Sequence, residues 1–158
     1  AARKNIDITL LLFDNSIYGL TKGQSSSTTP YSMATSSHPA GNPDQPLNAV
    51  KLALAYGASF VARGFAGEPE GLEDLIHQAT EHKGFSFVHI LTPCVTFDKE
   101  NFTWKRLREH TAWLDSAHDS SSLEAAVRLA ENEPFRLGVF FRDTEALSYQ
   151  ENLRRMNA

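Results

Sequence analysis

Apolar residues occur along the chain both in short continuous runs and at helical spacings. Residues 7–13 form a nearly uninterrupted apolar run, and residues 58–63 and 85–91 form two more. Such runs predict strands that are buried on both faces of a parallel sheet. Between them, residues 47–56 are rich in helix formers, and residues 71–83 place apolar side chains on one helical face. This alternation predicts an α/β fold, with a mainly parallel sheet and helices on both faces.

In the last third of the chain, the spacing of apolar residues is less regular. Residues 101–114 are predicted to be helical and carry both tryptophans of the chain. Residues 122–130 form a second predicted helix, which begins with a serine suited to capping its first turn. A strand over residues 135–141 and a terminal helix over residues 144–156 complete the predicted elements.

The run at residues 7–13 lies almost at the start of the chain. A buried parallel strand needs neighbouring strands on both sides. We therefore expect this sequence to be part of a larger chain, with an N-terminal part of the fold absent.

Composition and charge restrict the kind of protein. The chain has 158 residues, of which 41% are hydrophobic, and these figures suit one globular domain. Its uninterrupted apolar runs, such as residues 10–13, are far shorter than the ~20 residues of a membrane helix, so no membrane partner is expected. A net charge of −4 argues against nucleic acid as a partner. The single cysteine, Cys94, excludes an internal disulfide framework and any metal site built from this chain's cysteines alone.

Residues 20–48 form a long irregular segment that is rich in serine, threonine and proline and carries only two charges, Lys22 and Asp44. This composition is typical of a flexible linker. A loop of this length within a compact domain is otherwise mostly functional. Composition alone leaves both interpretations open.

Two segments follow predicted strands where parallel sheets bind ligands, namely residues 14–24 and residues 92–94. Asn15 and the nearby carbonyl groups are hard oxygen donors, suited to Mg²⁺ that is bound together with a phosphate. The spacing of Gly19 and Gly23 excludes a Walker A loop. By themselves, the residue types favour a turn at the end of the strand followed by a solvated loop.

Residues 13–24, Phe-Asp-Asn-Ser-Ile-Tyr-Gly-Leu-Thr-Lys-Gly-Gln, closely resemble the thiamine-diphosphate-binding β subunit of 2-oxoacid:ferredoxin oxidoreductases. The similarity continues, in the order of the family, through residues 55–63, 82–87, 91–94 and 137–142. The resemblance implies that residues 1–158 are the C-terminal portion of a thiamine-diphosphate-binding domain. In that portion, residues 20–48 would form a cofactor and substrate loop, and residues 101–158 a C-terminal extension.

The resemblance also implies a cofactor site. Asn15 matches the side-chain ligand of Mg²⁺, and Ile17 matches the residue whose backbone carbonyl binds the ion. Tyr18, Gly19, Leu20 and Thr21 would line the diphosphate and the thiazolium ring. The remaining Mg²⁺ ligand of the family is an aspartate in a Gly-Asp-Gly segment, which would lie upstream of this sequence.

Substrate preference follows from two positions in the same motif. Leu20 lies where pyruvate-specific members of the family often have asparagine, and the whole motif is similar to members that handle 2-oxoglutarate. Lys22 supplies a point charge on a long stem, which suits the distal carboxylate of such a substrate. Its alternative role is that of an ordinary solvated lysine. A proline common after this motif is replaced by Ser27, so the path of the loop is less restricted.

From residue type alone, Cys94 would be a buried hydrophobic residue. Its position in the resemblance implies instead that it is one ligand of a [4Fe-4S] cluster. Such clusters take four cysteines, so the other three would lie outside this chain.

The implied activity is the thiamine-dependent oxidative decarboxylation of a 2-oxoacid, most closely 2-oxoglutarate, to an acyl-coenzyme A. Electrons would pass through the cluster to ferredoxin, and the subunit would work with an α subunit in the cytoplasm. No residue of this chain is expected to be a catalytic acid or base. The alternative is a non-catalytic α/β interaction module with a degenerate cofactor pocket.

Overall fold

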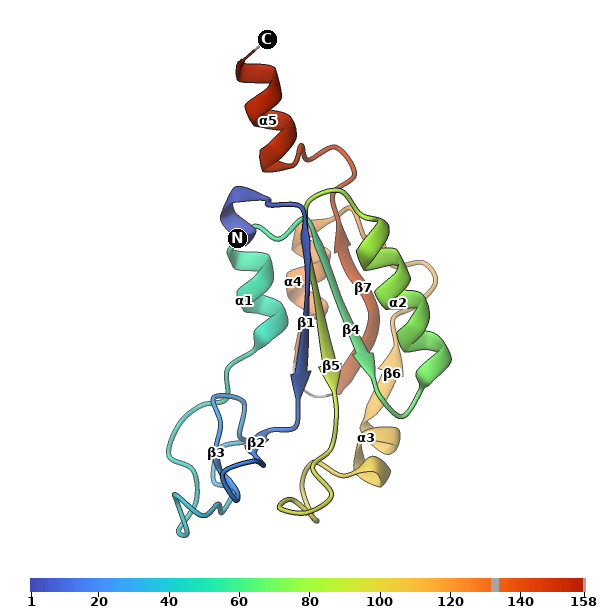
Figure 1. Cartoon of the computed structure of the whole chain (residues 1–158). Coiled ribbons are helices and arrows are strands. Elements are labelled where there is room, and N and C mark those ends of the chain that lie inside the picture. Colours follow the sequence, from blue (N-terminus) through green and yellow to red (C-terminus); the bar gives the residue numbers. More distant parts are fainter. Residues whose placement is uncertain (132–133, 158) are drawn as a thin grey trace.

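A computed structural model describes residues 1–131 and 134–157. Within these residues, five strands form one sheet in the order β1-β5-β4-β7-β6, and two short strands form a separate hairpin (Figure 1). The strands are β1 (Ile8–Asp14), β2 (Ile17–Tyr18), β3 (Gln24–Ser25), β4 (Phe60–Phe65), β5 (Phe85–Leu91), β6 (Thr111–Trp113) and β7 (Phe135–Arg142). The helices are α1 (Ala49–Ala55), α2 (Pro69–Glu81), α3 (Trp104–His110), α4 (Leu123–Leu129) and α5 (Tyr149–Met156), with a short 3₁₀ helix at Ala2–Lys4.

The centre of the sheet is parallel, as predicted. β5 pairs in parallel with both β1 and β4. Every residue of β4 and of β5 is buried, which agrees with the continuous apolar runs in the sequence. β7 pairs with β4 in the antiparallel direction, and β6 pairs with β7 in parallel, so the sheet is mainly but not wholly parallel.

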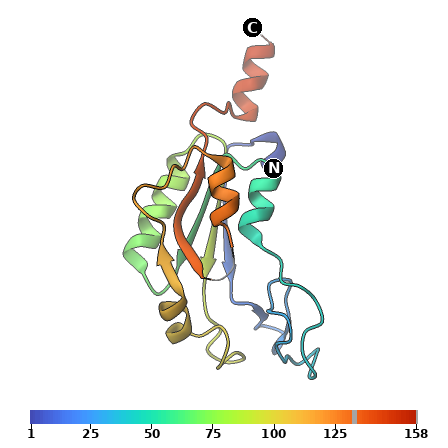
Figure 2. The same cartoon turned by 180° about the vertical axis from the view of Figure 1, so that it is seen from behind.

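Helices cover both faces of the sheet, which confirms the predicted α/β layers. α1 and α4 pack on one face, where their alanines contact Val61, Phe87 and Phe140 (Figure 2). α2 covers the opposite face, where Leu75 and Ala79 pack on Phe60 and Val88. The core therefore consists of two apolar layers with the sheet between them.

The first strand was expected to need a neighbouring strand on each side, and among the described strands it has one. β1 is an edge strand, hydrogen-bonded only to β5 among the described strands. Ile8, Leu10 and Phe13 are 48%, 47% and 64% exposed. The apolar run fixed the strand and its length, but burial of its outer edge requires a neighbour that the described residues do not supply.

The helix predicted over residues 101–114 is shorter in the structure. α3 ends at His110, and the next three residues form β6, which pairs with the start of β7. Trp113 is on this strand, where its indole nitrogen donates to a carboxylate oxygen of Glu68 at 2.7 Å. A strand pairing with distant residues replaced the end of the helix, and local spacing does not report such pairing.

The ends of the other elements follow local signals. Gly57 has a φ of 77°, which supports its predicted role in ending α1. The capping box of α5 joins Ser148 and Glu151, and the helix projects away from the sheet at the end opposite to the β2–β3 hairpin (Figure 1). In the described part of the chain, no helix has both the length and the apolar composition required to cross a membrane.

Candidate active site at the carboxyl end of the sheet

β1 and β5 end side by side, β1 at Asp14 and β5 at Leu91. The amide of Thr92 donates to the carbonyl oxygen of Asp14 at 2.8 Å, so the two loops that follow these strands begin together. Ligands of open parallel sheets bind beyond this end of the strands. Both segments singled out in the sequence, residues 14–24 and 92–94, therefore lie in one region of the molecule (Figure 1).

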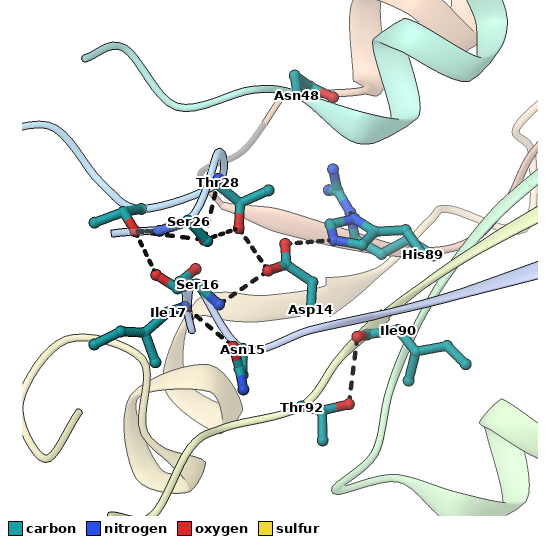
Figure 3. Close-up of polar contacts among 12 residues, drawn as sticks. Asp14, Asn15, Ser16, Ile17, Ser26, Thr28, Asn48, His89, Ile90 and Thr92 are labelled. Atoms are coloured by element: carbon teal, nitrogen blue, oxygen red, sulfur yellow. Dashed lines mark hydrogen bonds and ion pairs between the residues drawn. The ribbon is translucent and has the colours of Figure 1, made fainter. Parts of the chain in front are cut away.

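The chain leaves β1 through two overlapping side-chain turns. A carboxylate oxygen of Asp14 accepts from the amide of Ser16 at 2.9 Å, and the side-chain oxygen of Asn15 accepts from the amide of Ile17 at 3.1 Å (Figure 3). Aspartate and asparagine form such turns because their short side chains reach the backbone two residues on. Ser16 takes a left-handed conformation, with a φ of 57°. These turns set the direction in which Asn15 and Ile17 leave the sheet.

The following residues form a tight hairpin. The Tyr18 carbonyl accepts from the amide of Gly23 at 2.9 Å, and the Gly19 carbonyl accepts from the amide of Lys22 at 3.2 Å. Gly23 has a φ of 93°, which glycine adopts without strain. The tip of the hairpin is solvent-exposed, and Leu20 is 99% exposed.

A groove of about 570 Å³ runs along this hairpin. Its lining contains all six residues predicted to bind the cofactor, together with hydroxyl groups of the serine- and threonine-rich loop. The lining residues are Leu12, Phe13, Asp14, Asn15, Ile17, Tyr18, Gly19, Leu20, Thr21, Ser26, Ser27, Thr28 and Leu47. Amide, hydroxyl and backbone groups of this kind can hydrogen-bond a diphosphate and supply hard oxygen ligands to Mg²⁺.

The residues present therefore fit part of a thiamine-diphosphate and Mg²⁺ site. In the described part of the chain, histidine, cysteine, aspartate and glutamate side chains form no group of three that could hold a metal ion. Asn15 and the Ile17 carbonyl would be two of the six oxygen ligands that Mg²⁺ takes. The remaining ligands would have to come from the diphosphate, from water and from residues outside this set.

The loop over residues 20–48 is folded, so the flexible-linker interpretation of its composition was wrong. Thr29 is fully buried, and its hydroxyl donates to the Ser16 carbonyl at 2.6 Å. The side-chain amide of the buried Asn42 donates to the Thr29 carbonyl at 3.0 Å. The Leu47 amide donates to the Ser27 carbonyl at 2.8 Å, which closes the loop onto the groove. The serine and threonine hydroxyl groups thus form hydrogen bonds with one another and with backbone groups of the loop.

Lys22 lies apart from the other predicted residues. It is exposed at the turn of the hairpin, with a φ of 76°, and the groove lining does not include it. Its role toward a distal carboxylate therefore stays a prediction.

Cys94 lies against the β2–β3 hairpin. A Cβ atom placed on Gly19 would be 3.3 Å from the Cys94 sulfur and 3.7 Å from the side-chain nitrogen of Asn15. The cysteine is unpaired and half-buried. Three residues further on, the Phe97 ring packs in the same way against Gly23, with its nearest atom 3.3 Å from a Cβ placed there. The two glycines let the cysteine loop and the hairpin approach closely.

A network of buried polar side chains below the groove was not predicted from the sequence. His89 bonds through Nε2 to one carboxylate oxygen of Asp14, Oδ2, at 2.9 Å (Figure 3). On its other side, Nε of Arg63 donates to Nδ1 of His89 at 3.2 Å. Asp14 also accepts from the Thr28 hydroxyl at 2.6 Å. The only local signal was the presence of an arginine and a histidine within apolar strands.

Burial determines the charge states in this chain of residues. Burial lowers the pKa of Arg63 to about 10, an effect opposed by the negative charge of Asp14, so the guanidinium is charged at neutral pH. Burial also lowers the pKa of His89, and Arg63 adds to this effect. Burial by itself would raise the pKa of Asp14, but hydrogen bonds from His89, Thr28 and Ser16 hold it below its usual value. One positive and one negative charge thus lie on either side of a neutral imidazole.

Two family models cover almost the whole chain. Residues 1–90 match the thiamine pyrophosphate enzyme, C-terminal TPP binding domain. Residues 94–158 match the C-terminal segment of the pyruvate ferredoxin oxidoreductase beta subunit. The boundary between the two matches lies just before Cys94.

Curated relatives and a solved structure agree with these models. The chain is 39% identical to the 2-oxoglutarate synthase subunit KorB of Archaeoglobus fulgidus over 90% of its own length and 51% of the relative's. It is 36% identical to the 2-oxoglutarate oxidoreductase subunit KorB of Mycobacterium tuberculosis over 87% of its length and 34% of the relative's.

Its fold matches a chain of the 2-oxoglutarate:ferredoxin oxidoreductase from Magnetococcus marinus, solved with 2-oxoglutarate, coenzyme A and succinyl-CoA bound. The TM-score is 0.93 and the identity 38%, over 99% of this chain and 54% of that one. The resemblance drawn from the sequence motifs is thereby confirmed. The chain spans about half the length of the first of these relatives and of the solved chain.

Proposed function

Because the chain belongs to the family of thiamine pyrophosphate enzyme C-terminal TPP binding domains, we propose that it is part of the β subunit of a 2-oxoglutarate:ferredoxin oxidoreductase. The observation that carries this proposal is the groove along the cofactor hairpin, which gathers all six predicted cofactor residues beside the only cysteine of the chain. The match to an enzyme solved with 2-oxoglutarate supports the choice of substrate.

In the proposed reaction, a 2-oxoacid, coenzyme A and two oxidised ferredoxins yield an acyl-coenzyme A, CO₂, a proton and two reduced ferredoxins. Bound thiamine diphosphate would supply the carbanion chemistry that allows CO₂ to leave. The residues of this chain would bind and orient. Asn15 and the Ile17 carbonyl would hold Mg²⁺, and the stretch from Tyr18 to Thr21 would line the diphosphate and the thiazolium ring.

Cys94 would lend one thiolate to a [4Fe-4S] cluster, with the other three thiolates supplied from outside this chain. Its sulfur lies beside Gly19, which lines the cofactor groove. A cluster bound there would adjoin the site of decarboxylation, as one-electron oxidation requires. Ferredoxin would then accept the electrons.

Lys22 and Leu20 would recognise the substrate at the exposed end of the hairpin. Leu20 is almost fully exposed, and the side chain of Lys22 is exposed beside it, so both can contact a partner subunit or a bound substrate. The proposal includes an α subunit and a cytoplasmic location, both of which rest on the family.

The test uses the full-length protein purified without oxygen together with its α partner. Its iron–sulfur absorbance in the visible range should bleach when 2-oxoglutarate and coenzyme A are added. Cys94→Ser should remove that absorbance. An unchanged spectrum in this variant would reject the ligand role, and a colourless wild-type protein would favour a non-catalytic module.

A second variant tests substrate recognition. Lys22→Ala should reduce turnover of 2-oxoglutarate more than turnover of pyruvate, because only the former has a distal carboxylate. Lys83→Ala is the matched control, since Lys83 is exposed and lies just before the start of β5, whereas the hairpin follows the end of β1, which runs parallel to β5. Equal losses for both substrates would reject the role of Lys22.

A further inference from the structure

A chain of buried polar residues crosses three strands and ends at the cofactor turn. Arg63 on β4 is fully buried, His89 on β5 is 3% exposed, and Asp14 at the end of β1 is 9% exposed. Arg63 is the direct cross-strand partner of His89, and Asp14 lies two residues beyond the β1 partner of His89. The three side chains therefore share one face of the sheet, and the middle one contacts both others.

The hydrogen bonds that link Arg63, His89 and Asp14 have one defined direction, from donor to acceptor. The Arg63 side chain only donates, so Nδ1 of His89 must accept its bond. The proton of the neutral imidazole is then on Nε2, which donates to Asp14. A histidine held in this form presents Asp14 with a donor at one defined position.

Asp14 in turn holds two residues at the groove by hydrogen bonds. Its other carboxylate oxygen, Oδ1, accepts from the Ser16 amide at 2.9 Å and from the Thr28 hydroxyl at 2.6 Å. Ser16 lies between Asn15 and Ile17, the two residues that would bind Mg²⁺, and Thr28 lines the groove. One carboxylate thus joins the buried strands, the turn and the serine- and threonine-rich loop (Figure 3).

Arg63 is the member of this group of three side chains that lies farthest from the groove, and it has further contacts of its own. One guanidinium nitrogen donates to the Glu131 carbonyl at 3.0 Å, and its carbon lies 5.3 Å and 5.4 Å from the ring centres of Phe135 and Phe140. The positive charge of Arg63 compensates the buried negative charge of Asp14, since the imidazole between them is neutral. Without Arg63, the imidazole would not be held with its proton on Nε2, and Asp14 would lose a donor at a fixed position.

We infer that Arg63 and His89 are positioning residues, which act through Asp14 to hold the turn that binds Mg²⁺ and the diphosphate. The inference rests on the proposed function. Partners behind a metal ligand commonly contribute about 10- to 100-fold to metal affinity. We therefore expect a loss of that size in cofactor affinity when the hydrogen bond between His89 and Asp14 is removed.

Two substitutions of His89 separate its two bonds. In His89→Gln the side-chain NH₂ can take the place of Nε2 and keep the bond to Asp14, while the acceptor for Arg63 is lost. In His89→Asn the shorter side chain can keep an acceptor for Arg63, while the bond to Asp14 is lost. His82→Gln is the control, because His82 also bonds through Nε2, to the Ser59 hydroxyl at 2.7 Å, but precedes the start of β5, whereas Asp14 pairs with Leu91 at the end of that strand.

The experiment measures binding of thiamine diphosphate by calorimetry in excess Mg²⁺, using the full-length protein with its partner. His89→Asn should raise the dissociation constant about tenfold or more, while His89→Gln and His82→Gln should stay within about threefold of the wild type. Hydrogen exchange at the Ser16 amide should be faster in His89→Asn and unchanged in the other two. A purely structural role would not move this amide selectively.

The outcomes distinguish the two levels of the proposal. If the wild-type protein binds thiamine diphosphate and His89→Asn binds equally well, the positioning role is wrong and the proposed function stands. If His89→Gln weakens binding as much as His89→Asn, the positioning role is also wrong. A wild-type protein that binds no thiamine diphosphate overturns both proposals. Arg63→Lys, which keeps the buried charge, replaces His89→Asn if that variant does not fold, and should also speed exchange at Ser16.

Discussion

Asp98→Ala removes the acceptor for three backbone amides in the loop that follows Cys94. One carboxylate oxygen of Asp98 accepts from the amides of Glu100 at 3.1 Å and Asn101 at 2.8 Å. The other oxygen accepts from the amide of Phe102 at 2.8 Å. The Asp98 side chain is 4% exposed, so water does not readily replace it. These bonds hold the chain between the cysteine loop and α3 in one path.

The size of the effect follows from what becomes of each amide. A hydrogen bond to a charged group contributes about 1.5–3 kcal/mol, and an orphaned buried donor adds its own desolvation cost. Glu100 and Asn101 are exposed, so their amides regain water, whereas Phe102 is only 4% exposed and packs in the apolar cluster that contains Leu107. We therefore expect a loss of about 3 kcal/mol in the free energy of unfolding, rather than the full sum of three bonds.

Two further variants should lose less stability than Asp98→Ala. Asp98→Asn can turn its oxygen toward the buried Phe102 amide and its NH₂ group toward the exposed amides of Glu100 and Asn101, so it should cost about half as much, at ~1.5 kcal/mol. Asp119→Ala is the matched control, because Asp119 accepts from the amide and hydroxyl of Ser121 in a similar turn that is exposed to solvent. It should change stability less than either variant of Asp98.

The assay is denaturant unfolding of the purified protein, combined with hydrogen exchange of the Phe102 amide. The free energy of unfolding should fall in the order wild type, Asp119→Ala, Asp98→Asn, Asp98→Ala, and Phe102 should exchange faster only in the variants of Asp98. If Asp98→Ala and Asp119→Ala lose the same stability, burial does not determine the contribution of Asp98, and the expected order is refuted.

Three further predictions concern single contacts. Gly19→Val crowds the Cys94 sulfur and should lower the iron content of the assembled enzyme more than Gly19→Ala; full iron retention by both contradicts this. Burial, then the charge of Arg142, lowers the pKa of His82, so the unfolded state binds its proton first. The melting temperature should therefore fall as pH drops below about 6.5, and fall less in His82→Gln. Phe140→Ala empties a fully buried site and should cost about 3–5 kcal/mol in denaturant unfolding, well above an exposed Phe97→Ala.

The predictable parts of the fold are those whose signals are local. β4 and β5 were predicted from continuous apolar runs, and the structure buries every residue of both strands. The predicted end of the first helix at Gly57 was correct because a left-handed glycine is a short-range signal. The end of α3 at His110 was missed, since the following residues pair with β7, which is distant in the sequence.

The candidate site divides in the same way. The motif from Asn15 to Thr21 was identified from the sequence, because these residues are contiguous and the groove follows one hairpin. Residue patterns placed Cys94 and Gly19 at the same end of the sheet but did not show that they touch, and they gave no sign that Arg63 connects to Asp14. Each contact depends on which strands are neighbours. An arginine within an apolar strand indicates a buried partner but does not identify it.

The sequence by itself determined the class of fold and the main strands and helices, because each is encoded in the spacing of nearby residues, and residues 13–24 identified the family through their resemblance to it. Only the tertiary structure decided that β1 lies at an edge and that the loop over residues 20–48 is folded. It also decided that His89 connects a buried arginine to Asp14 at the turn that follows β1. These features arise from the order and register of strands, and register brings together side chains whose separation in the sequence carries no local signal.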